Sequence, residues 1–93
     1  MREEMDRDVW YHICCIKQSV LEHPCGSVQW HHEFIYAGRR QNVKWGILPV
    51  CVWIHEREKR KDISKLLEDI MHLRAPVIAR VQYPKHKWPK QTK

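Results

Sequence analysis

Residues 28–61 constrain the fold of this chain more than any other stretch of it. The run 28–36 is rich in β-branched and aromatic side chains, which favours a β-strand. A polar loop over 37–42 follows, and residues 43–50 can return as a second strand. Two neighbouring strands joined by a short loop predict a hairpin in the middle of the chain.

Helical signals follow this hairpin. Pro49 suits the first turn of a helix, because its φ angle is fixed and it lacks an N–H group, so residues 51–61 can continue as a helix. Beyond them, Asp62 is a suitable N-cap, and apolar side chains then recur at helical spacing. Those side chains are Ile63, Leu66, Leu67, Ile70 and Met71. The expected class is α+β, with a ββα core and an additional C-terminal amphipathic helix.

Size and charge limit the remaining possibilities. The chain has 93 residues, which suits a single domain over 1–93. Its formal charge of +6 and its pI near 9.4 suit a polyanionic partner such as nucleic acid. Residues 84–93 include four lysines and are expected to form a basic, weakly ordered tail, whereas residues 1–8 read as a polar lead-in.

Two further features of the sequence bear on where in the cell the protein is expected. No apolar run approaches the ~20 residues that span a bilayer, so no membrane association is expected. The charged residues 1–8 lack the apolar centre of a secretory signal, and a cytoplasmic protein is therefore expected. In that reducing compartment, the cysteines at positions 14, 15, 25 and 51 are expected to be thiols or metal ligands.

Three histidines carry the predicted chemistry. His31 and His32 are adjacent on a predicted strand, so in ideal β geometry they point to opposite faces and cannot both bind one metal ion. His55, on the helix that follows, could supply a second ligand. A metal held by few protein groups keeps positions open for water and phosphate, which suits phosphodiester cleavage. A neutral imidazole beside it can accept a proton from water, because its pKa lies near neutrality.

Three short motifs occur in a recognisable order. They are Trp30-His31-His32, Gly38-Arg39-Arg40 and Leu48-Pro49-Val50-Cys51-x-x-x-His55. This order resembles the HNH (His-Me finger) endonucleases, especially small phage-encoded members, over roughly residues 13–75. The resemblance implies a ββα-metal core and hydrolysis of DNA phosphodiester bonds. It assigns His32 as the general base, and His31 and His55 as ligands of a divalent metal, either Mg²⁺ or a transition metal such as Mn²⁺, Ni²⁺ or Zn²⁺.

The sequence departs from that family in two places. The middle Asn of the motif is expected near Gly46, whereas Asn42 lies four residues earlier. Many members also bind a structural zinc with two Cys-x-x-Cys pairs; Cys51 fits the first position of the second pair, but Ile54 occupies its partner position. What the resemblance leaves possible is a structural Zn²⁺ held by Cys15, Cys25 and Cys51, with Cys14 or His23 as the fourth ligand.

The sequence also gives expectations about which basic residues contact DNA and about the partners of the protein. Arg39, Arg40 and Lys44 either solvate the loop or contact DNA phosphates, since arginine pairs bidentately with phosphate oxygens. Two other functions stay open: a non-catalytic nucleic-acid-binding module that retains the fold, and a phage interaction protein with structural zinc. A homodimer or a larger protein partner would suit so small a nuclease, and a phage-encoded protein would act inside its host cell.

Overall fold

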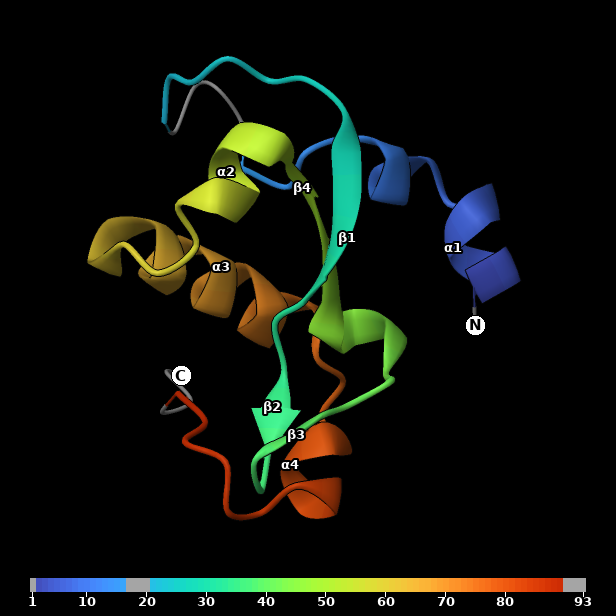
Figure 1. Cartoon of the computed structure of the whole chain (residues 1–93). Coiled ribbons are helices and arrows are strands. Elements are labelled where there is room, and N and C mark those ends of the chain that lie inside the picture. Colours follow the sequence, from blue (N-terminus) through green and yellow to red (C-terminus); the bar gives the residue numbers. More distant parts are fainter. Residues whose placement is uncertain (1, 17–20, 90–93) are drawn as a thin grey trace.

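A computed structural model describes residues 2–16 and 21–89 as a small α+β protein. Two antiparallel strands cross the middle of the molecule, with α2 and α3 on one side and α1 on the other (Figure 1). The strands are β1 (Val28–His32), β2 (Ile35–Tyr36), β3 (Arg39–Arg40) and β4 (Ile47–Cys51). The α-helices are α1 (Arg2–Arg7), α2 (Val52–Glu56), α3 (Lys61–Arg74) and α4 (Ala79–Gln82). Two 3₁₀ turns, η1 (Val9–His12) and η2 (Lys44–Gly46), complete the list. None of the helices in these ranges is long and apolar enough to cross a membrane.

The central sheet pairs β1 with β4, from Val28 opposite Cys51 to His32 opposite Ile47. Every residue of β4 is buried, as expected for an apolar run that carries the core. A second sheet pairs β2 with β3, so the predicted loop over 37–42 contains a short strand. The predicted hairpin therefore exists, but its inner part is a separate small ribbon.

Pro49 lies in β4, and the predicted helix start at this residue is wrong. It is paired with Trp30 in the sheet, and its carbonyl accepts the N–H of Cys15 at 2.8 Å. A proline is tolerated in a strand of a two-stranded sheet where its position only has to accept a hydrogen bond. The helix begins three residues later, with α2 at Val52.

The amphipathic helix α3 is confirmed, with a different first turn. It begins at Lys61 with Arg60 as its N-cap residue, so Asp62 lies inside the helix. The Asp62 carboxylate accepts the N–H of Ile63 and pairs with the Arg60 guanidinium. Of the apolar stripe, Ile63, Leu67 and Met71 are fully buried against the core. The strand β4 packs against this helix.

Both ends of the described chain are more ordered than expected. The lead-in forms α1, and Met5 is buried with Tyr11 and Ile47 in a small second core. At the other end, residues 84–89 fold back beneath α3 (Figure 1). There the Trp88 ring lies 6.0 Å from that of Phe34, and the indole N–H donates to the Tyr83 carbonyl at 2.9 Å. Residues 90–93 of the predicted tail lie outside the described residues.

Gly46 explains why the predicted strand over 28–36 is interrupted. The N–H groups of Glu33 and Phe34 both donate to the Gly46 carbonyl, at 2.9 and 3.2 Å. Two residues opposite one acceptor bend the chain after His32, as a β-bulge does. A Cβ atom at position 46 would lie 2.7 Å from the Phe34 Cβ and 2.9 Å from the Val43 Cγ2. Only glycine allows this approach.

Gly46→Ala is therefore expected to destabilise the protein by about 1–3 kcal/mol, because the added methyl group must displace the Phe34 and Val43 side chains. Denaturant unfolding followed by tryptophan fluorescence measures the change. Gly26→Ala is the matched control, since a Cβ there meets nothing within 4 Å. Equal stability of the two variants would show that the close approach at Gly46 does not constrain the fold.

Candidate metal centres

Four sulfur and nitrogen ligands meet at one end of the central sheet. They belong to Cys14, His23, Cys25 and Cys51, and their ligand atoms all lie within 4.8 Å of one another. The His23 Nε2 lies 2.8 Å from the Cys25 Sγ and 3.8 Å from the Cys14 Sγ. Cys51 is the last residue of β4, while the other three come from the segments before β1. The four cysteines of the chain are free thiols.

The electrostatics of this cluster suit a metal ion. The His23 Nδ1–H donates to the Leu21 carbonyl at 2.6 Å, which leaves the Nε2 lone pair facing the sulfur atoms. Desolvation, together with the neighbouring Cys14 and Cys51 thiols, raises the pKa of Cys25 to about 12, and burial likewise raises the pKa of Cys14. The thiols of Cys14 and Cys25 therefore stay protonated at neutral pH unless a cation stabilises their thiolate forms. Three cysteines and one histidine whose ligand atoms lie this close together can hold a metal ion such as zinc, which takes four such ligands in a tetrahedron.

The structure places Cys14 in this cluster, whereas the sequence favoured Cys15. The backbone N–H of Cys15 pairs with β4 at Pro49, and adjacent side chains on an extended segment point in opposite directions. The Cys15 thiol is thus turned away, and burial raises its pKa to about 12. Cys25 and Cys51 lie where expected, and both candidates for the fourth position, Cys14 and His23, belong to the cluster.

A second group of ligands lies where β1 meets the end of α2. His31 from β1, His55 from α2 and Glu58 from the turn after α2 bring their ligand atoms within 4.8 Å of one another. The Glu58 Oε2 lies 3.0 Å from the His31 Nδ1 and 3.8 Å from the His55 Nε2. That oxygen is buried, and its contacts with the two imidazoles lie at ion-pair distance, while no donor among the described residues meets it with hydrogen-bond geometry.

A buried carboxylate oxygen without a donor is costly unless a cation compensates it. The donor set of two imidazoles and one carboxylate fits a transition ion such as Mn²⁺, Ni²⁺ or Zn²⁺, and its oxygen also suits Mg²⁺. Three protein ligands leave coordination positions open for water or a phosphate oxygen. The residues present therefore fit a catalytic type of metal site.

His32 lies beside this second group. Its Nε2 lies 3.1 Å from the Asn42 Oδ1, and since an amide oxygen only accepts, the ring donates through Nε2–H. In the tautomer that makes this bond, Nδ1 carries the lone pair of the ring and can accept a proton. His31 and His32 both line one hollow of about 340 Å³. Strand alternation alone would have put them on opposite faces.

The predicted basic contacts separate into two places. Arg39 and Arg40 form β3 and are exposed on the small ribbon, without an ion pair in residues 2–16 and 21–89. Lys44 lies in η2 instead, with its Nζ 3.5 Å from the Asp8 Oδ2 and 5.8 Å from the centre of the Tyr11 ring. Lys44 therefore holds the N-terminal segment, apart from the two arginines.

Glu58 is the site residue that sequence reasoning missed. It follows His55 by three residues, one helical turn, and that spacing places two side chains on one face. This signal was concealed by the neighbouring cations, because Arg57, Lys59, Arg60 and Lys61 are typical of a solvated helix end. His23 offered a similar signal in its His-x-Cys spacing with Cys25.

Comparisons of the chain with protein-family models, with curated proteins and with solved structures gave no match. What the two centres do must therefore be judged from their own geometry and chemistry.

Proposed function

We propose that this protein is a metal-dependent endonuclease of the HNH type that hydrolyses DNA phosphodiester bonds. The observation that carries the proposal is the position of His32, whose imidazole lines the same hollow as His31 and Glu58, two members of the His31–His55–Glu58 group. A base beside a metal site with open positions is the combination that phosphodiester hydrolysis requires. The net charge of +6 suits a polyanionic substrate.

The residues would divide the reaction as follows. His32 accepts through Nδ1 the proton of the water that attacks phosphorus, while Asn42 holds the ring through Nε2–H. His31, His55 and Glu58 hold the divalent cation. A bound cation would supply Lewis-acid polarisation of the phosphate and stabilisation of the negative charge that develops on the leaving oxygen. Arg39 and Arg40 contact neighbouring phosphates, because guanidinium groups pair with two oxygens at once.

Asn42 supports this arrangement at the place where the sequence departs from the family pattern. No side chain fits at position 46, because a Cβ there would contact Phe34 and Val43. The amide that reaches the proposed base comes instead from Asn42, on the returning arm of the hairpin. An asparagine thus braces the loop beside the base, although it stands four residues before the expected position.

The first centre has a structural part in the proposal. We propose that Cys14, His23, Cys25 and Cys51 bind Zn²⁺, which joins the loop before β1 to the end of β4. His55 lies four residues beyond Cys51, on the helix that starts immediately after it. A zinc ion here would fix the position of a ligand of the second centre.

The test is cleavage of supercoiled plasmid in Mg²⁺, Mn²⁺, Ni²⁺ or Zn²⁺, with EDTA as the negative control. Nicked and linear products are expected with at least one metal and none with EDTA. Glu58→Gln should raise the metal concentration needed for half-maximal cleavage by about 10-fold or more, a loss already seen when only the hydrogen-bond partners of metal ligands are removed.

Glu56→Gln is the matched control, since it removes the same charge from an exposed side chain on α2 that pairs, among residues 2–16 and 21–89, with Arg57 alone. It should cleave as the wild type does. Intact plasmid in every metal, or cleavage that survives EDTA, would contradict the proposed function.

A further inference from the structure

A second hollow adjoins the one that holds the histidines. It has a volume of about 480 Å³ and lies between the β2–β3 ribbon, α3 and the C-terminal segment. Its ribbon side is formed by residues 35–37 and its opposite side by residues 85–87. Ile35 lines both hollows, so the two meet at this exposed side chain.

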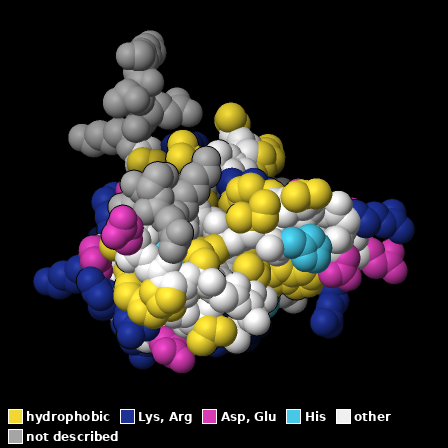
Figure 2. All heavy atoms as spheres, turned by 90° about the horizontal axis from the view of Figure 1, so that it is seen from above, with side chains coloured by type: hydrophobic (Ala, Val, Ile, Leu, Met, Phe, Trp, Pro, Cys, Tyr) yellow, Lys and Arg dark blue, Asp and Glu magenta, His cyan; other side chains and the backbone are white. Residues whose placement is uncertain are grey.

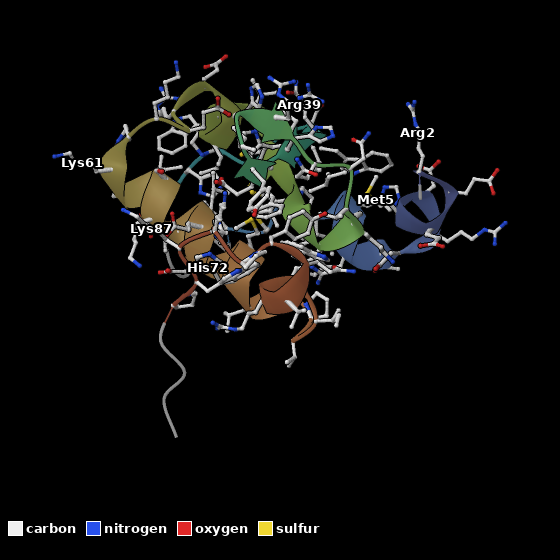
Figure 3. All side chains as sticks on the ribbon, turned by 90° about the horizontal axis from the view of Figure 1, so that it is seen from below. Arg2, Met5, Arg39, Lys61, His72 and Lys87 are labelled. Atoms are coloured by element: carbon white, nitrogen blue, oxygen red, sulfur yellow. The ribbon has the colours of Figure 1, made fainter. Side chains whose placement is uncertain are left out.

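The C-terminal side of this hollow is held in place by its own contacts. The Lys85 N–H donates to the Tyr36 hydroxyl at 3.4 Å, which joins the segment to the ribbon. The Nε2 atoms of His86 and His72 lie 2.9 Å apart, which joins it to α3. Figure 3 shows Lys87 and His72 close together, with Arg2 on the far side of the molecule. Residues 85–87 are therefore held in place by these contacts and form one wall of the hollow.

The charges along this wall are positive and unpaired. Lys85 and Lys87 are exposed, and no carboxylate of residues 2–16 and 21–89 forms an ion pair with either. Burial lowers the pKa of His86, so the imidazole between them is neutral at pH 7 and the two lysines supply the charge. Glu68 of α3 is the one carboxylate among the residues that line the hollow. The ribbon opposite the lysines carries the equally unpaired Arg39 and Arg40.

The face seen from above differs from this wall. On the upper face of the molecule, apolar side chains make up much of the surface, and lysines and arginines lie mainly at the margins (Figure 2). An exposed cationic hollow beside a proposed phosphodiester site, open and partly polar, suits a sugar–phosphate backbone better than an apolar ligand.

We propose that this hollow is a second DNA-contacting subsite, in which Lys85 and Lys87 neutralise phosphates of the strand that occupies the metal centre. The strand would leave the hollow of His31 and His32, pass over Ile35 and enter the space between the ribbon and the C-terminal wall. This inference rests on the proposed function, because it takes DNA as the occupant of the first hollow.

The test compares two double variants that remove the same charge. Lys85→Ala/Lys87→Ala changes the wall, and Arg2→Ala/Arg7→Ala changes α1 on the far side. Fluorescence anisotropy with a labelled 20-base-pair duplex, without added divalent metal, gives the affinity at several salt concentrations. For two lost phosphate contacts, the slope of log K against log salt should fall by about 1.8 in the lysine variant. The arginine variant should change it much less.

Binding and cleavage separate the possible failures. Equal losses of slope in both double variants would overturn the subsite, even if the wild type cleaves DNA. A selective loss in the lysine variant supports the subsite, even if no metal gives cleavage and the proposed function fails. Charge reversal, Lys85→Glu/Lys87→Glu, should weaken binding further than the alanine variant does, and equal binding by the two would also overturn it. Thermal melting of all variants checks that the fold is kept.

Discussion

His32→Ala is expected to lower the rate of DNA cleavage by about 10²- to 10⁴-fold, the range that a positioned general base contributes. In the proposed mechanism the imidazole accepts the proton of the attacking water, and an alanine side chain cannot take that role. The His31–His55–Glu58 ligands are untouched, so metal affinity should stay near that of the wild type. Single-turnover cleavage and a metal titration, carried out on the same preparation, measure the two properties separately.

His12→Ala is the control for the loss of a histidine as such. His12 is exposed, and its Nε2 hydrogen-bonds the Asp6 carbonyl in the N-terminal segment. It should cleave like the wild type. Asn42→Ala should give an intermediate loss, because the base keeps its nitrogen but loses the group that orients the ring. Unchanged cleavage by His32→Ala would remove this residue from the mechanism.

The second large effect concerns the cysteine–histidine cluster. Cys25→Ala should lower the stability of the metal-loaded protein by several kcal/mol, since Cys/His zinc sites bind with an apparent free energy on the order of 10 kcal/mol that is available only to the folded state. Cys25 is exposed, so little packing is lost with its side chain. For a chain of this size each kcal/mol shifts the melting temperature by about 4–8 °C.

Metal content and melting together provide the measurement. The wild type should hold one zinc in this cluster, Cys25→Ala should bind it weakly, and a strong chelator should melt the wild type early. Because the pKa of Cys25 is raised, zinc must displace a proton there, and its affinity should fall as the pH is lowered. Cys15→Ser is the control, as its thiol lies outside the cluster. Equal zinc content and melting in both variants would contradict the assignment.

Regular features of the sequence predicted the regular features of the fold. The stripe of α3 followed from spacing alone, and the central pair of strands followed from composition, because both patterns report local preferences that the core reinforces. The bend after His32 did not follow, since it depends on a contact between Gly46 and Phe34 that only the folded chain makes. Pro49 was misread for the same reason: its partner is the backbone of Cys15, thirty-four residues away.

The candidate sites show the same division between local and tertiary information. His31, His32 and His55 were identified by their order along the chain, and the structure brings all three to one region. The selection of Cys14 over Cys15 depends on which way the segment turns when it meets β4. The spacing of Glu58 from His55 is local information, but its contact with His31 is tertiary, because only folding brings β1 to the end of α2.

The helix α2 is five residues long, far below the length of about 12–15 residues at which an isolated helix becomes even marginally stable. It must therefore be held from outside. The buried Cys51 precedes it, Ile54 is buried beneath it, and the Arg57 guanidinium after it stacks 4.2 Å from the centre of the Trp53 ring and donates to the Trp53 carbonyl. The direction in which the His55 side chain points is consequently set by these contacts, so residues outside the proposed metal centre orient one of its proposed ligands.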